Sequence, residues 1–329
     1  MSDPLATSRQ PGRSAPDLNA LAPLLGTVRD VLRAAVSAFG AADLQYGQGT
    51  ANAYDDAVAL VYWALHLPVD APDALLDARL SPQEVGNCLS LIRERTISRR
   101  PVAYLTGEAW LRGLRFRADE RALVPRSLLV EVLQESLMQW RSYIDPDQAE
   151  HDPDWPARIL DLCTGGGSIA IHAAHRFPRA TVLALDINED ALALCAENIA
   201  LHRLGERISL RRSDLLGAVS DDRFDLILCN PPYVPDSSMD QLPPEFRAEP
   251  VLALAGGSDG MDLVRRLLAD ARRCLDPHGV LLIEIGHEQA AFEAAFPTLS
   301  FAWLPVSAGE QMVAAIAAQD LPPASASAQ

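Results

Sequence analysis

The sequence predicts an α/β protein with a doubly wound, mostly parallel sheet that ends in an antiparallel hairpin, preceded by a small helical domain. From residue 158 onward, short apolar strands alternate with helical segments, which is typical of a parallel sheet covered by helices on both faces. Near the C-terminus only residues 307–311 separate two apolar strands. No crossover helix fits there, so these strands should pair antiparallel. Between residues 18 and 100 the apolar spacing is helical throughout.

The helical domain is expected to span residues 18–103. Its clearest helix start is at residues 81–84, where Ser81 is placed as N-cap, a proline follows, and Glu84 closes a capping box. A second helix is predicted over residues 53–67, ended by a proline. The flanking residues 1–17 and 321–329 are rich in Ser, Pro and Ala and are expected to be a disordered leader and tail.

A hairpin linker is predicted over residues 104–125, because two short strand patterns flank Gly113. A second, larger domain is expected over residues 126–320, and its first helix is predicted at 127–143. Residues 144–156 are acidic and proline-rich and are expected to be a surface linker. The strands of the sheet are predicted at residues 159–162, 181–185, 208–211, 224–229, 280–285, 301–306 and 312–318, with helices at 169–176, 191–202 and 261–274.

The composition favours a protein partner over a nucleic acid. The 329 residues carry a net charge of −16, while 49% are hydrophobic and 22% charged, which is ordinary for a globular protein. Nucleic-acid affinity depends largely on Lys and Arg, whereas an acidic surface attracts a basic protein. We therefore expect no direct nucleic-acid binding.

The cysteines and the apolar segments indicate a cytoplasmic protein. Five cysteines lie far apart in the sequence, without a paired spacing, which favours reduced thiols in the cytosol. No signal peptide is visible at the N-terminus, and no apolar window is long enough to span a bilayer. We expect no membrane partner.

A glycine-rich turn follows the first strand of the sheet. Residues 161–167 read Asp-Leu-Cys-Thr-Gly-Gly-Gly, and glycines there let the backbone turn sharply and approach a ligand at a helix N-terminus. Gly165, Gly167 and Ala170 also fit a relaxed dinucleotide pattern. A nicotinamide enzyme is therefore an alternative at this point.

Acidic residues near the turn favour S-adenosylmethionine as the cofactor. Asp161 would repel a pyrophosphate but attract the ammonium and sulfonium of that methyl donor. Asp186 ends the second strand, where a carboxylate accepts both ribose hydroxyls, and Asp214 with Leu215 is placed to contact the adenine. The residues expected to bind the cofactor are Asp161, Cys163, Thr164, Gly165, Gly166, Gly167, Asp186, Asp214, Leu215 and Asn230.

The most specific motif is Asn230-Pro231-Pro232-Tyr233, after the fourth strand. The prolines fix the backbone and leave carbonyls free, so the Asn oxygen and a proline carbonyl can accept both hydrogens of a planar NH2 group. The Tyr ring gives that group a flat packing surface. Two aligned acceptors aim the nitrogen lone pair at the methyl group, so positioning and electrostatics carry the reaction. All four residues are expected to bind substrate, with Asn230 and Tyr233 catalytic.

With these motifs the chain resembles amino-methyltransferases that act on exocyclic NH2 groups, either adenine in DNA or glutamine in proteins. Residues 100–107 are similar to the interdomain segment of the HemK-like protein-(glutamine-N5) methyltransferases, and Glu249-Pro250 with Gly256-Gly257 resembles their loop after the motif. The resemblance covers about residues 20–318. It implies a class I S-adenosylmethionine methyltransferase fold and a helical domain that recognises the protein substrate.

Within that family the chain is more similar to the ribosomal-protein branch than to the release-factor branch. The release-factor enzymes usually read Pro-Arg-Pro-Asp-Thr-Glu after the hairpin, whereas residues 124–127 here read Val-Pro-Arg-Ser, with Glu131 further along. Gly166 and Ser168 depart from the Ser and Cys that are more usual in the ribosomal branch. The resemblance implies methylation of a glutamine in large-subunit ribosomal protein L-three, during ribosome assembly.

Three alternatives stay open from the sequence: methylation of peptide release factors, N6-methylation of adenine in nucleic acid, and a ribosome-binding protein with a vestigial methyltransferase fold. No metal site is expected, because His172 and His175 lack a third ligand and are taken as helix-surface residues. Cys229 is expected to pack in its strand, and Glu284 is assigned no role.

Overall fold

The computed structural model describes residues 16–145, 154–219 and 222–323, so most of the predicted leader and tail, and of the 144–156 linker, lies outside the described residues. The chain divides into two compact units, Met1–Thr106 and Gly107–Gln329. Of the hairpin linker predicted over residues 104–125, residues 104–106 belong to the first unit, where they are helical, and the rest belongs to the second unit. No helix in the described ranges is long and apolar enough to cross a membrane.

The first unit is helical, as predicted. It contains α1 (Leu18–Leu21), α2 (Val28–Ala41), α3 (Ala53–Ala64), α4 (Pro82–Ser98) and α5 (Val102–Thr106), with short 3-10 turns at Ala22–Leu24 and Asp73–Asp77. The predicted capping box at Ser81 and Glu84 is confirmed at the start of α4. Apolar faces of α2, α3 and α4 meet in one core around Phe39, Leu60 and Ile92. Helix α3 ends three residues earlier than predicted, at Ala64.

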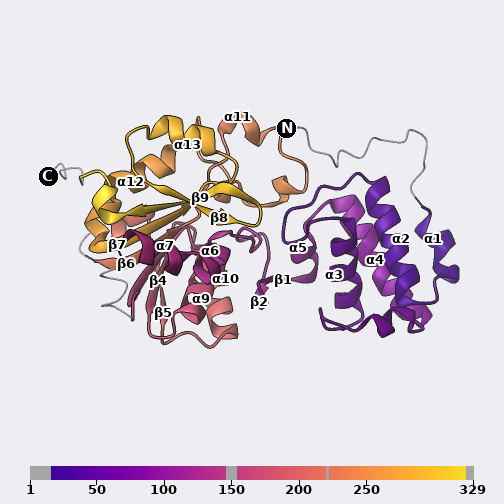
Figure 1. The fold of residues 1–329 in the computed structure, drawn as a ribbon. Coiled ribbons are helices and arrows are strands. Elements are labelled where there is room, and N and C mark those ends of the chain that lie inside the picture. Colours follow the sequence, from indigo (N-terminus) through magenta and orange to yellow (C-terminus); the bar gives the residue numbers. More distant parts are fainter. Residues whose placement is uncertain (1–15, 146–153, 220–221, 324–329) are drawn as a thin grey trace. The chain divides into compact units, whose positions relative to one another are not determined.

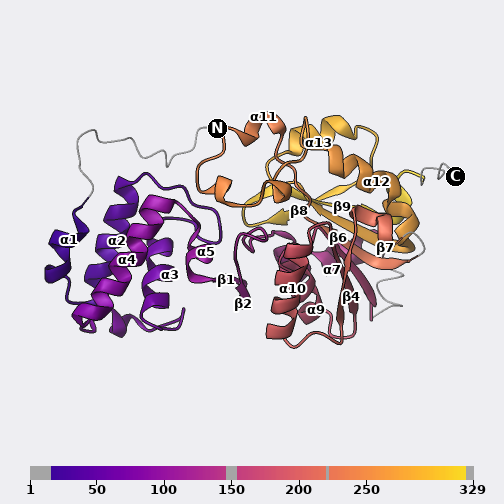
Figure 2. The same cartoon turned by 180° about the vertical axis from the view of Figure 1, so that it is seen from behind.

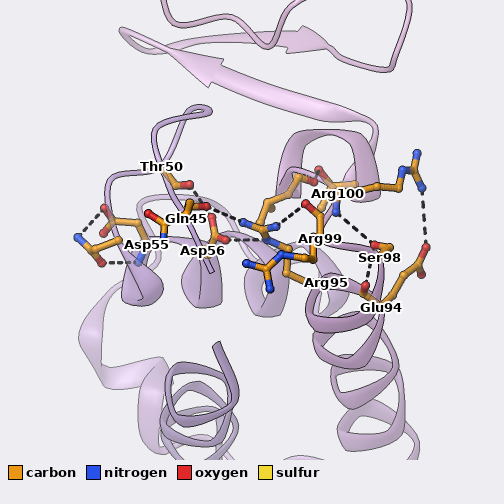
Figure 3. A network of polar contacts seen from close by, with 12 residues as sticks. Gln45, Thr50, Asp55, Asp56, Glu94, Arg95, Ser98, Arg99 and Arg100 are labelled. Carbon is orange, nitrogen blue, oxygen red and sulfur yellow. Dashed lines mark hydrogen bonds and ion pairs between the residues drawn. The ribbon is translucent and has the colours of Figure 1, made fainter. Parts of the chain in front are cut away.

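A buried arginine ties the helices of this unit to the loop after α2 (Figure 3). Arg95 and Asp56 form an ion pair with Nε and Oδ2 2.9 Å apart, and both side chains are almost completely buried. The Arg95 guanidinium also donates to the carbonyls of Arg99 and Gln45. Arg99 ends α4 in a left-handed conformation and donates to two carbonyls in the same loop, those of Ala42 and Asp43.

The second unit begins with the predicted hairpin, β1 (Glu108–Leu111) and β2 (Leu114–Arg117). The single helix predicted at 127–143 is instead two helices, α6 (Leu129–Glu135) and α7 (Leu137–Ile144). Ser136 lies between them. Its hydroxyl has no hydrogen-bond partner among the described residues. The apolar periodicity of the sequence did not indicate this break.

The sheet of the second unit has the order β5-β4-β3-β6-β7-β9-β8. Strands β3 to β7 are parallel, while β9 pairs antiparallel with both β7 and β8, so the predicted doubly wound sheet with an antiparallel end is confirmed. The strands are β3 (Arg158–Leu162), β4 (Thr181–Asp186), β5 (Ile208–Arg212), β6 (Phe224–Cys229), β7 (Leu275–Glu284), β8 (Ala302–Val306) and β9 (Gly309–Ala317).

Alternate residues of each strand pack on opposite faces of the sheet. Ile159 belongs to a core that also takes in α6, α7, α9 (Ser168–Arg176) and α10 (Glu189–Leu201), whereas Leu160 belongs to a core with α12 (Asp262–Cys274) and α13 (Gln289–Ala295). Figures 1 and 2 show these helices on the two sides of the strands. This period of two follows from strand geometry. The sequence analysis missed α13 and the short helix α11 (Asp236–Met239).

Candidate functional site

A cavity of about 430 Å³ lies at the carboxyl ends of the parallel strands, within the second unit. Its wall includes the turns after β3, β4, β5 and β6, together with residues 121–127 and parts of the segment 250–266. Open α/β sheets bind ligands at this edge, and the volume falls in the range usual for small-molecule sites.

The glycine turn after β3 needs unusual backbone conformations. Cys163, Gly165 and Gly167 have φ values of 56°, 54° and 85°, in the left-handed region that favours glycine. Gly165 and Gly166 line the cavity together with Cys163 and Thr164. Gly167 does not line it. A Cβ at Gly167 would lie 2.4 Å from Sγ of Cys195 in α10, so this glycine allows helix packing rather than ligand approach.

Asp161 lies beneath the turn and is not part of the cavity wall. Its Oδ2 accepts hydrogen bonds from the Thr164 hydroxyl, at 2.6 Å, and from the Ala170 amide, at 3.0 Å. The carboxyl is fully buried, and this burial raises its pKa to about 7. Oδ1 has no partner among the described residues. Asp161 thus braces the turn and the start of α9, and the predicted direct contact with the cofactor has no support from its placement.

Asp186 lines the cavity at the end of β4, as predicted for a ribose ligand. Its Oδ2 accepts from the Gly165 amide at 2.8 Å, and its Oδ1 accepts from the Asn188 amide at 2.9 Å. An ionised carboxylate has about four lone-pair sites, so each oxygen keeps capacity for a ligand hydroxyl. Burial raises the pKa of Asp186, and backbone hydrogen bonds from Asn188, Gly165 and Ile187 oppose this shift.

Asp214 and Leu215 also line the cavity, after β5. Leu215 is held in a left-handed conformation with a φ of 47°. The Asp214 carboxylate pairs with Arg266 of α12 at 2.7 Å, a partner that the sequence analysis did not identify. Both side chains are about half exposed, so this pair contributes little to stability.

These residues fit S-adenosylmethionine. Acceptor-only carboxylates stand at the ends of β4 and β5, where a ribose diol and an adenine amino group need acceptors. Ile187 and Leu215 add apolar wall beside them. The cavity also reaches Asn230, so one ligand can extend from these carboxylates to the residue predicted to hold the substrate.

The Asn230–Tyr233 motif forms a tightly held loop after β6. Asn230 and Pro232 line the cavity, whereas Pro231 and Tyr233 do not. The Tyr233 ring packs so closely on Gly286 that a Cβ there would lie 2.7–2.8 Å from ring atoms. Burial raises the pKa of Tyr233 well above its usual value. The structure therefore brings Asn230 to the cofactor cavity and fixes the orientation of the Tyr233 ring.

Outside the motif, the sequence analysis misjudged His172 and assigned no role to Glu284. His172, expected on a helix surface, is buried; its Nε2 lies 3.1 Å from the Leu111 carbonyl, and burial lowers its pKa to about 4. Glu284 has a structural role that had not been assigned, because it accepts from the Ser127 hydroxyl at 2.6 Å and from the Leu128 amide at 2.9 Å, just before α6.

Within the described ranges no three His, Cys, Asp or Glu residues gather as metal ligands.

We expect Asp186→Ala to weaken S-adenosylmethionine binding by about tenfold or more, since a lost hydrogen bond to a charged group costs about 1.5–3 kcal/mol. Titration calorimetry measures this affinity. Asp190→Ala is the control, because it removes the same charge from an exposed position in α10 outside the cavity wall. Unchanged affinity in Asp186→Ala would remove this residue from the cofactor site.

Comparison with known proteins gives consistent matches. The family model described as "Methyltransferase small domain" matches residues 150–246. The ribosomal protein uL3 glutamine methyltransferase of Bordetella pertussis is 49% identical, over 90% of this chain and 97% of the relative. The proteins of the same name from Burkholderia pseudomallei and Bradyrhizobium diazoefficiens are 48% and 44% identical, over 90% and 94% of this chain and 96% and 97% of those relatives.

Proposed function

The chain belongs to the family of ribosomal protein uL3 glutamine methyltransferases, and we propose that it transfers a methyl group to the side-chain amide nitrogen of a glutamine in ribosomal protein uL3. S-adenosylmethionine is the methyl donor. The observation that carries the proposal is that Asn230, in a rigid Asn-Pro-Pro-Tyr loop, lines the same cavity as the ribose-type carboxylate Asp186. An acceptor for an amide and a site for the donor thus share one cavity.

The loop has the acceptor groups that the two hydrogens of an amide nitrogen need. Such a nitrogen is a weak nucleophile, because its lone pair is delocalised into the carbonyl. When bound, S-adenosylmethionine supplies an electrophilic methyl group on its sulfonium. The Asn230 side-chain oxygen and a proline carbonyl of the loop accept the two amide hydrogens, which turns the lone pair toward the methyl. Preorganised acceptors of this kind act mainly by electrostatics and positioning.

Tyr233 is proposed to pack against the amide plane and limit its rotation. Its ring is held on Gly286, and the Val234 amide that follows donates to the Leu254 carbonyl at 2.9 Å. No strong general base is required, because the nitrogen becomes acidic once methylated and then releases its proton. Burial raises the pKa of Tyr233, so its hydroxyl stays protonated at neutral pH and does not act as a general base.

The acidic surface is proposed to favour uL3 as a basic partner. A net charge of −16 steers a cationic protein toward the enzyme, and association should slow as salt screens the charges. We propose that methylation takes place in the cytoplasm before the large subunit is complete, without direct contact to nucleic acid. The helical first unit is proposed to recognise the substrate.

Intact-mass spectrometry tests the choice of substrate. Purified uL3 and a release factor are incubated separately with the enzyme and S-adenosylmethionine. We expect uL3 to gain the mass of one CH2 unit, the net change of a single methylation, and the release factor to remain unmodified. Methylation of the release factor alone would reject uL3 as the substrate while leaving glutamine methylation as the reaction.

A further inference from the structure

We propose that Arg126 and Glu249 form a positioning pair that fixes the substrate loop, residues 230–233, through the segment 250–257. This inference rests on the proposed function, because it assigns how the amide-binding loop is held. Neither residue is proposed to touch the reacting atoms. Arg126 lines the cavity, as do residues of the segment 250–257, and Glu249 directly precedes that segment.

The contacts of Glu249 are those of a fixed anchor. Its carboxylate is buried and accepts one hydrogen bond on each oxygen from the Arg126 guanidinium, at 2.7 and 2.8 Å. It also accepts from the Val124 amide at 3.1 Å. The Arg126 guanidinium lies over the Phe246 ring, 5.6 Å from its centroid. A bidentate pair between a planar guanidinium and a carboxylate sets orientation as well as distance.

The segment after Glu249 is hydrogen-bonded to the backbone directly after the substrate loop. The Val234 amide donates to the Leu254 carbonyl at 2.9 Å, the Gly256 amide donates to the Val234 carbonyl at 2.8 Å, and the Asp236 amide donates to the Gly257 carbonyl at 2.9 Å. Gly256 approaches so closely that a Cβ there would lie 2.7 Å from Cα of Tyr233. A shift of the anchor therefore moves or strains the chain at Tyr233.

The burial of the Glu249 carboxylate, beside an Arg126 side chain that is 21% exposed, supports a positioning role over a purely stabilising one. Moving two charges out of water is costly, and a buried ion pair is often no more stabilising than apolar side chains of similar size. The Arg126–Glu249 pair does, however, hold the two side chains in a single relative orientation. A second ion pair, Arg265 with Asp259, lies just after this segment, and its side chains are both 43% exposed. That pair offers a matched comparison, because it has the same chemistry without burial.

Glu249→Gln tests the proposal, with Arg265→Ala as the control. The glutamine keeps the size of the side chain and one acceptor oxygen but loses the charge. A misplacement of about 1 Å at a reacting group can cost about 100-fold in rate, so we expect kcat on uL3 to fall about 10- to 100-fold. S-adenosylmethionine affinity, measured by calorimetry, should stay within a few-fold. Arg265→Ala should leave kcat unchanged.

Two further measurements separate positioning from general loss of stability. Hydrogen exchange reads the contact between the segment 250–257 and the end of the substrate loop without any turnover. The amides of Val234, Asp236 and Gly256 should exchange faster in Glu249→Gln than in wild type, whereas Arg265→Ala should leave their exchange unchanged. A double-mutant cycle with Tyr233→Ala should show that the two rate losses do not multiply, since both act on one loop. If Glu249→Gln fails to fold, Arg126→Lys keeps the charge but loses the bidentate geometry and is measured instead.

Each outcome has a defined meaning. An unchanged kcat and unchanged loop exchange in Glu249→Gln would overturn the positioning pair, and so would rate losses that multiply fully with Tyr233→Ala. Failure of the wild-type enzyme to methylate uL3 would overturn the proposed function instead. In that case the exchange measurement still decides whether the pair holds the loop.

Discussion

Asn230→Ala is expected to lower kcat about 100- to 1,000-fold, since removal of one preorganised electrostatic contact commonly costs that much. The Asn230 oxygen is proposed to hold an amide hydrogen only when substrate is bound. The carboxylate Asp186 stays in place in the variant, so S-adenosylmethionine affinity should remain within a few-fold. Steady-state rates on uL3 measure the first effect, and calorimetry measures the second.

Asn230→Asp is the matched comparison for this prediction. Aspartate has the shape of asparagine and keeps a side-chain oxygen as acceptor, so its rate should fall less than that of the alanine variant. A wild-type rate in Asn230→Ala would reject the amide-holding mechanism even with the fold and the cofactor site intact. An equal loss in both variants would point to the NH2 group of Asn230 as the part that matters.

Arg95→Ala is expected to destabilise the helical first unit strongly. Removing one partner of a buried ion pair typically costs about 3–5 kcal/mol, because the other charge stays buried without compensation. Here the charge left behind is that of Asp56. Burial raises the pKa of this carboxyl, and the nearby Arg95 charge offsets part of the increase. The hydrogen bonds that tie α4 to the Gln45 and Arg99 carbonyls are lost as well.

Calorimetry of the full chain and hydrogen exchange of α3 and α4 measure this loss. Arg29→Ala is the control within the same unit, because Arg29 and Asp77 form an ion pair whose side chains are 58% and 72% exposed. It should change the melting temperature little. The cofactor cavity is lined by residues of the second unit only, so S-adenosylmethionine affinity should survive in Arg95→Ala. Equal exchange in Arg95→Ala and wild type would show that the pair does not stabilise the unit.

Local pattern was enough to predict most of the fold. The capping box at Ser81 and the hairpin around Gly113 depend on neighbouring residues, and both are confirmed. The antiparallel end of the sheet followed from the short connection at 307–311, and β8 and β9 do pair this way. Helix α13 escaped prediction, because it is short and buries only Phe292.

The sequence patterns could not predict contacts between residues that are far apart in the chain. Arg126 and Glu249 are 123 positions apart, and nothing in either segment identified the other as its partner. The role of Gly167 depends on Cys195 of α10, and the position of Asp161 below the turn depends on how α9 starts. Residue types at strand ends thus indicated the site, but only the packing of the chain shows which of them reach the cavity.

The most direct test of the proposed function is tandem mass spectrometry of uL3 after incubation with the enzyme and S-adenosylmethionine. Fragmentation locates the added methyl group on one residue and distinguishes the side-chain amide of a glutamine from other acceptors. We predict a single methyl group on one glutamine of uL3, present with the wild-type enzyme and largely absent with Asn230→Ala. A methyl group on a lysine or a carboxyl group, or uL3 left unmodified by the wild-type enzyme, would contradict the assignment.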